Sequence, residues 1–236
     1  MRKTAICLIL LLILGVGYHP LLGNSVGPQI SAQNGTNHID TNELMAEVAK
    51  KASDNDIVKR QGLRFWKQIT VRDLDKKGRI IERRGIKQGA GLDNEGLGLN
   101  PNELLSSSYI FTLKGHEEKN GRVCYIISFE PKPGLPDKGN GYKRVAIRFK
   151  GTLWIDVEKL YLVRMEAEMP RETEFSIWWP AGKIYKVNME VTQSLRPNFD
   201  NIVVLDKVTV KIEYRKLFSH YSEEYIHEYT DYKQIQ

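Results

Sequence analysis

Regular alternation of apolar and polar side chains between residues 142 and 169 constrains the fold of this chain most. Successive side chains of a β-strand point to opposite faces, so this alternation predicts two strands with one buried and one hydrated face. Gly151 interrupts the first strand at a place typical of a bulge or a close backbone approach, and residues 157–159 suit a hairpin turn. The apolar positions are Val145, Ile147, Phe149, Leu153 and Ile155 in the first strand, and Tyr161, Val163, Met165, Ala167 and Met169 in the second. We therefore expect a large antiparallel sheet with one face in water.

The N-terminal residues have the pattern of an export signal. Two basic residues precede an apolar run at 6–16, which is too short to span a bilayer comfortably, and small residues follow it. We expect cleavage near Ala32, a site near Ser25 fits as well, and a retained N-terminal anchor is the alternative. The sequence thus predicts a signal peptide at 1–32, one domain at 33–236, and a periplasmic location.

Charge and cysteine content narrow the classes of function. The formal net charge is +6, but basic and acidic residues alternate along the predicted strands, which indicates a solvated surface and no nucleic-acid partner. After cleavage Cys124 is the one remaining cysteine, so no intramolecular disulfide can form. Its place within a predicted strand indicates a packed, inert thiol.

One helix and several further strands complete the predicted fold. Asp40 and Glu43 have the spacing of a capping box, and apolar residues at helical spacing follow, which predicts a helix at about 42–60. Residues 75–78 and the pair Asn120–Gly121 predict tight turns. The other alternating runs are 63–72, 79–87, 109–113, 123–129, 183–193, 208–215 and the Tyr-rich run 217–233.

The sequence contains no recognisable catalytic or metal-binding motif. His220 and His227 have glutamates nearby, but their spacing matches no metal-ligand pattern, so we predict that they are surface residues. The glycine-rich run at 88–100 lacks the residues of a phosphate-binding loop and predicts a flexible loop. Glu166 and Glu168 lie on a hydrated strand face, where charge pairing between strands explains them. We expect no enzymatic activity, no metal and no cofactor.

A sheet of about nine to eleven strands, as the alternating runs suggest, is too wide to stay flat and should curl. One helix cannot cover so large a concave face, so either side chains or an apolar ligand fill the remaining space. Trp178-Trp179-Pro180 predicts either a corner of the sheet or a lid, membrane or partner contact. The expected lining residues are Phe65, Phe111, Tyr125, Ile127, Phe149, Leu153, Val163, Met165, Tyr185 and Met189. Ordinary core packing is the alternative for each of them.

Three segments together resemble a known family. GRVCYIISFEPKPG at 121–134, GTLWIDVEKLYLVRMEAEM at 151–169 and FWKQITVRDLDKKGRIIERR at 65–84 are similar to the bacterial outer-membrane lipoprotein-sorting proteins of the LolA/LolB-like superfamily. The run 151–156, followed by 162–164, is the most specific part. The resemblance implies a mainly β fold: a curled antiparallel half-barrel with an N-terminal helix on its concave face. It also implies an exported carrier that holds acyl chains in an apolar cavity.

The first functional hypothesis is therefore a periplasmic, non-enzymatic carrier of a lipid or lipoprotein acyl chain, in outer-membrane lipoprotein sorting as the resemblance implies. The alternative is an envelope sensor of the same fold that binds a partner protein. A membrane surface is a further partner that this location allows. An enzyme that uses His220 or His227 is a third hypothesis, for which the sequence offers no supporting motif.

Overall fold

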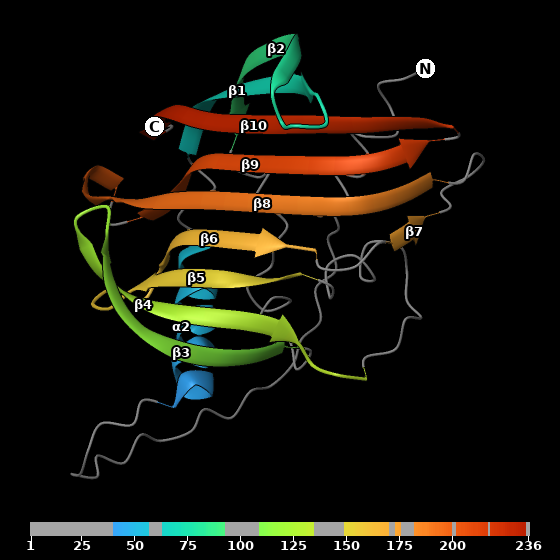
Figure 1. Cartoon of the computed structure of the whole chain (residues 1–236). Coiled ribbons are helices and arrows are strands. Elements are labelled where there is room, and N and C mark those ends of the chain that lie inside the picture. Colours follow the sequence, from blue (N-terminus) through green and yellow to red (C-terminus); the bar gives the residue numbers. More distant parts are fainter. Residues whose placement is uncertain are drawn as a thin grey trace, which may run out of the picture.

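The computed structural model describes residues 40–56, 63–92, 109–134, 149–169, 173–175, 182–199, 202–216 and 218–234. Within these ranges the chain forms one ten-stranded sheet and one long helix, α2 (Figure 1). The elements are α2 (Thr41–Asp56), β1 (Leu63–Leu74), β2 (Ile80–Leu92), β3 (Tyr109–Lys119), β4 (Arg122–Pro131), β5 (Lys150–Asp156), β6 (Leu162–Glu168), β7 (Thr173–Phe175), β8 (Gly182–Arg196), the 3₁₀ turn Pro197–Phe199, β9 (Ile202–Lys216) and β10 (Ser219–Gln234).

The strand order is β2-β1-β10-β9-β8-β6-β5-β4-β3, and the short strand β7 pairs with β8 beside this path. The pairings are antiparallel, and β2 and β3 form the two edges, so the sheet is open. The last strand, β10, lies between β1 and β9 in the interior of the sheet. The predicted fold class, a mainly β, curled antiparallel sheet with an N-terminal helix, is confirmed.

The helix packs on one face of the sheet, which we call the core face. Its stripe of Leu44, Met45 and Val48 joins the main hydrophobic cluster. The carboxylate of Asp40 accepts a hydrogen bond from the backbone N–H of Asn42 at 2.8 Å and so caps the first turn. Figure 1 shows α2 behind β3, β4 and β5, crossing these strands. The predicted helix is confirmed over its described length; residues 57–60 lie outside the described ranges.

Two of the predicted turns have the backbone that their residues favour. Asn120 and Gly121 both have positive φ, 53° and 72°, as a two-residue type I′ hairpin requires. At the β1–β2 turn Gly78 has φ 77°, and the carboxylate of Asp75 accepts backbone N–H bonds from Lys77 and Arg79, each at 2.8 Å. Both hairpins are where the sequence predicts them.

A β-bulge in β6 changes which residues face the core. The pairing of β5 with β6 shifts between Leu162 and Arg164, which leaves Val163 as an additional residue. Leu162 then packs against the main cluster, whereas Tyr161 and Val163 join a second cluster on the opposite face. The prediction that Tyr161 and Val163 share a face with Met165 is wrong, because a one-residue slip inverts the alternation.

A second bulge displaces Tyr185. The pairing of β8 with β9 shifts between Ile184 and Lys186, so Ile184 enters the main cluster in place of Tyr185. The ring of Tyr185 instead stacks on the exposed ring of His220, with 5.4 Å between ring centroids. The predicted face of Tyr185 is therefore wrong for the same reason.

Some expectations fall outside the described residues. These are the signal peptide at 1–32, the first part of the alternating arm at 142–148, and Trp178-Trp179-Pro180. Of the glycine-rich run, residues 88–92 belong to β2, which corrects the predicted loop there, and residues 93–100 lie outside the described ranges. None of the described helices combines the length and the apolar character needed to cross a membrane.

Candidate functional site

Most of the predicted cavity residues come together on the core face. Six of them are buried in the main cluster and two more pack against it half-buried. The buried residues are Phe65, Ile127, Phe149, Leu153, Met165 and Met189, and the half-buried ones are Phe111 and Tyr125. Val163 and Tyr185 lie apart from this group, as the two bulges require. The group draws on β1, β3, β4, β5, β6 and β8, and so spans the sheet.

Methionine is concentrated on this face. The sequence contains five methionines, and all of them except Met1, namely Met45, Met165, Met169 and Met189, lie in the main cluster. They come from α2, from β6 and its C-terminal end, and from β8. An unbranched thioether side chain adapts to irregular apolar shapes, which makes it common at surfaces that bind variable ligands. The main cluster thus includes adaptable side chains from both the helix and the sheet.

The helix is smaller than the face on which it packs. A helix of 16 residues is about 24 Å long. Nine strands side by side, as in the main path of the sheet, span about 38 Å. Since α2 packs close to β3, at one edge of the sheet, it does not reach the part of the core face formed by β9, β10 and β1.

That far part of the core face combines aliphatic side chains of β9 with polar and aromatic side chains of β10. The carboxylate of Glu223, with a relative exposure of 1%, accepts hydrogen bonds from the hydroxyls of Tyr225 at 2.6 Å and Tyr214 at 3.2 Å. Tyr221 stacks on Tyr214 with 5.1 Å between ring centroids, and His227 is buried two residues beyond Tyr225. The prediction that His227 is a surface residue is wrong. The alternation of aromatic residues along β10 is the signal that could have placed Glu223 and His227 on the inner face.

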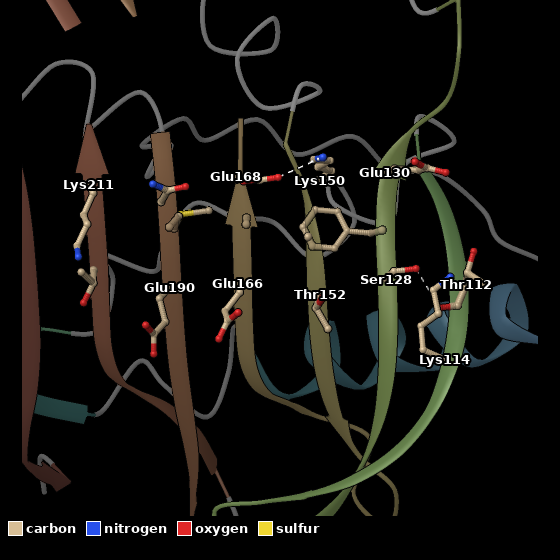
Figure 2. Close-up of a pocket in the computed structure, with 16 residues that line it drawn as sticks. Thr112, Lys114, Ser128, Glu130, Lys150, Thr152, Glu166, Glu168, Glu190 and Lys211 are labelled. Atoms are coloured by element: carbon tan, nitrogen blue, oxygen red, sulfur yellow. Dashed lines mark hydrogen bonds and ion pairs between the residues drawn. The ribbon is translucent and has the colours of Figure 1, made fainter. Parts of the chain in front are cut away.

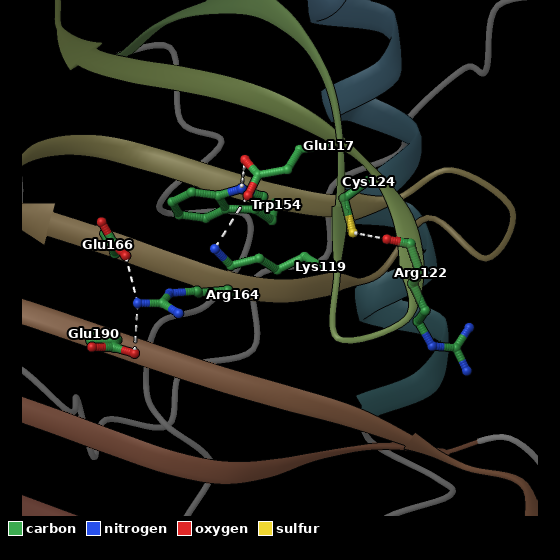
Figure 3. A network of polar contacts seen from close by, with 8 residues as sticks. All are labelled: Glu117, Lys119, Arg122, Cys124, Trp154, Arg164, Glu166 and Glu190. Carbon is green, nitrogen blue, oxygen red and sulfur yellow. Dashed lines mark hydrogen bonds and ion pairs between the residues drawn. The ribbon is translucent and has the colours of Figure 1, made fainter.

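The opposite side of the sheet, which we call the outer face, carries a second cluster around Trp154, with Cys124, Tyr161, Val163 and Val203. The tip of the β3–β4 hairpin lies over this cluster, as Figure 3 shows. The indole N–H of Trp154 donates to Glu117 at 3.2 Å, and Lys119 Nζ lies 5.0 Å from the centroid of the ring. The hydrogen bond from Trp154, followed by that from Lys119, lowers the pKa of Glu117 below its ordinary value.

A partly buried ion pair fixes the neighbouring β5–β6 turn. Arg122 donates to the carboxylate of Asp156 at 3.0 Å, and the same carboxylate accepts the backbone N–H bonds of Glu158 at 3.0 Å and Lys159 at 2.6 Å. Cys124 lies beside this pair, and burial raises the pKa of its thiol. The prediction of a packed cysteine is confirmed. The polar groups named here therefore have hydrogen-bond partners within the fold, and their presence is explained by structure alone.

The outer face is also hollowed between β3 and β9, over a volume of about 730 Å³ (Figure 2). Hydroxyl and amide side chains from five strands line the hollow: Thr112, Ser128, Thr152, Asn188 and Thr209. This polar groove lies on the side of the sheet opposite to α2, although three residues of the main cluster also line it: Phe129, Ala167 and Met189.

Charged side chains in and beside the hollow pair with one another. Lys150 contacts Glu168 at 3.2 Å, and Arg164 contacts Glu166 at 2.7 Å and Glu190 at 3.1 Å. The predicted pairing of charges between strands is confirmed at Glu168, whereas Glu166 pairs with Arg164 of its own strand, β6. Exposed pairs of this kind add little to stability and do not indicate catalysis. Within the described ranges, His, Cys, Asp and Glu side chains form no group of three that could hold a metal ion.

Comparisons with known proteins give structural matches only. No model of a known protein family and no curated protein matches the sequence. The structure is similar to a DUF1329 family protein from Desulfovibrio piger (12% identity, TM-score 0.37, covering 83% of this chain and 94% of the other). It is also similar to a domain described as an outer membrane lipoprotein-sorting protein from Vibrio parahaemolyticus (11%, 0.39, 82% and 93%) and to a LolA superfamily protein from Nitrosomonas europaea (8%, 0.36, 81% and 93%). Because these identities and TM-scores are low, the proposals below rest on the residues of this chain.

Proposed function

We propose that this chain is an exported, non-enzymatic carrier that binds the acyl chain of a lipid or lipoprotein between α2 and the core face. The observation that carries the proposal is the gathering of Met165, Met169 and Met189 on one sheet face, in one cluster with Met45 of a helix that is too short to cover this face. Burial of apolar ligand surface would drive binding, at about 25 cal/mol per Å² before the costs of association.

Entry of a ligand requires α2 to move away from the sheet. The helix contributes Leu44, Met45 and Val48 to the main cluster, whereas the strands contribute the larger share. Displacement of α2 would therefore expose the methionines of β6 and β8 and leave the sheet hydrogen bonds intact. An acyl chain could take the place of the helical stripe, because both present only aliphatic surface to the sheet.

Native mass spectrometry of the protein, purified after export and without detergent, tests the proposal directly. We expect a co-purifying acyl lipid, identified by solvent extraction, that is lost in Met165→Asp. The matched control is Leu63→Asp, which buries the same charge in a separate cluster with Ile202 and Val204. It should destabilise the fold but retain the lipid. A protein that is free of lipid and ignores added fatty acids would contradict the proposal and favour the partner-binding alternative.

Photo-crosslinking avoids the risk that a buried aspartate prevents folding. The unaltered protein is mixed with a fatty acid that carries a diazirine in its chain, irradiated and digested, and the labelled peptides are identified by mass spectrometry. Labels should fall in α2, β6 and β8, where the methionines lie. Labels confined to outer-face residues such as Thr152 and Asn188 would show that the apolar face does not hold the ligand.

A further inference from the structure

Three exposed apolar side chains lie at or beside two turns at one end of the sheet, whereas Val123, with a relative exposure of 58%, lies at the opposite end. Phe218, in the β9–β10 turn, has a relative exposure of 97%. Ile80 and Ile81, which follow the β1–β2 turn, have relative exposures of 46% and 68%. A phenyl ring that is almost fully exposed gains nothing from the fold, and its occurrence near two further exposed apolar side chains suggests contact with something outside the molecule.

The strand register places both turns at the same end. β1 and β10 are neighbours, with Asp73 opposite Glu223, and the β9–β10 hairpin closes with Lys216 opposite Ser219. The turn after β1 and the turn before β10 therefore leave the sheet in the same direction. In Figure 1 this is the end where β9 finishes and β10 begins, opposite to the tip of the β3–β4 hairpin.

Charge distinguishes this end from the other. Segments 75–83 and 213–220, which contain the two turns, hold six basic and three acidic residues. Among the basic residues Lys76, Lys77 and Arg215 are exposed. At the opposite end, segments 117–123 and 156–161 hold three basic and four acidic residues. The apolar tips thus coincide with the basic end of the sheet.

This combination suits a lipid surface better than a protein surface. A protein interface needs a contiguous, closely packed patch, whereas these side chains project singly from separate turns with cations between them. A bilayer accepts separate apolar side chains into its acyl region and attracts lysine and arginine to anionic headgroups. We propose that the β1–β2 and β9–β10 turns dock this protein on an anionic membrane surface, with Phe218 inserted below the headgroups and Lys76 and Lys77 among them. The proposal does not rest on acyl-chain binding by the core face.

Flotation with vesicles tests the docking. The protein is purified after export and its N-terminus is checked by intact mass, because an uncleaved signal peptide would itself bind lipid. It should float with phosphatidylcholine vesicles that contain phosphatidylglycerol, and added salt should weaken the binding. Absence of binding to these vesicles would overturn the proposal and leave a protein partner as the occupant of the tips.

Three variants assign the contact to named side chains. Phe218→Ser should weaken vesicle binding about tenfold, since one phenyl ring no longer leaves water. The double variant Lys76→Gln, Lys77→Gln should weaken binding to anionic vesicles roughly tenfold and leave weak binding to neutral ones unchanged. Val123→Ser removes a residue of 58% exposure at the opposite end and should have no effect. Equal losses in Val123→Ser and Phe218→Ser would overturn the assignment of the docking end.

A Phe218→Trp variant gives a direct readout of insertion. Its fluorescence should be quenched by brominated lipid more strongly than that of the unaltered protein, because the added indole would lie in the acyl region. Equal quenching would contradict insertion of Phe218. Substitutions at a side chain with 97% exposure leave the core intact, so co-purified lipid should be unchanged in Phe218→Ser. The proposal of membrane docking and the proposal of acyl-chain binding can thus be disproved independently of each other.

Discussion

Gly151 shows how a single residue fixes the centre of the sheet. A Cβ atom at this position would overlap the backbone carbonyl oxygen of Glu166 and lie 2.9 Å from the Cα atom of Ala167 on the neighbouring strand. Both are backbone atoms, which cannot rotate away as a flexible side chain can. Of the two expectations for Gly151, a close backbone approach is confirmed, whereas the register there is regular and contains no bulge.

We expect Gly151→Ala to lower the free energy of unfolding by about 1–3 kcal/mol, because the added methyl group forces β5 and β6 apart. Urea denaturation followed by circular dichroism measures the change. The matched control is Thr152→Ala, one residue further on the outer face, which should cost less than about 1 kcal/mol. Equal effects of the two variants would show that the close approach does not limit the residue at 151.

At the scale of elements, the β3–β4 hairpin is bent onto the outer face by a bulge. The pairing shifts between Leu113 and Gly115, and Gly115 has φ 145°, in a region that favours glycine. The shift carries the hairpin tip over Trp154, where Glu117 accepts the indole hydrogen bond. The tip is therefore held by a polar contact that depends on the charge of one carboxylate.

The pH dependence of this contact follows from the lowered pKa of Glu117. The stability that it contributes is present above the pKa of an unfolded glutamate, about 4.3, and is lost as the pH falls through the lower folded-state value. The Nε1–H NMR signal of Trp154 should shift with a midpoint below about 4.3. Glu117→Gln should remove this titration, and a midpoint at or above the ordinary value would contradict the contact in solution.

Bulges also explain which elements the sequence could and could not predict. Alternation and turn residues predict the strands and the hairpins at Asn120–Gly121 and 75–78, because both are local properties. Val163 and Tyr185 are on unpredicted faces, because a one-residue slip depends on the neighbouring strand and leaves no local signal. Most of the candidate core face could be predicted, since six of its residues are apolar at positions that alternate regularly.

For the whole molecule, strand order is the feature that local patterns cannot supply. The sequence indicates that the Tyr-rich C-terminal run belongs to the sheet, but only the pairings place β10 in its interior. β8 and β9, each 15 residues long, form its longest pair, and β2 and β3 are its edges. Stability should therefore decrease from the centre of the sheet to its edges.

Amide hydrogen exchange followed by mass spectrometry tests this gradient. Peptides from β8 and β9 should exchange most slowly, through global unfolding, because their backbone groups are paired on both sides. Peptides from β2 and β3 should exchange faster, through local opening at the edges. A β2 that is protected as strongly as β9 would indicate that a further segment or a partner covers that edge.

The pairing of β1 with β10 also determines how late in synthesis β1 can be completed as an interior strand. Leu63 pairs with Gln234, so the residues between them must be made before β1 can pair along its full length with β10, its second neighbour. At ordinary rates of translation that wait lasts roughly ten to thirty seconds. Until then β1 has only β2 beside it, and an isolated hairpin is barely stable in water. β1 consequently lacks its second neighbour until the residues of β10 have been made.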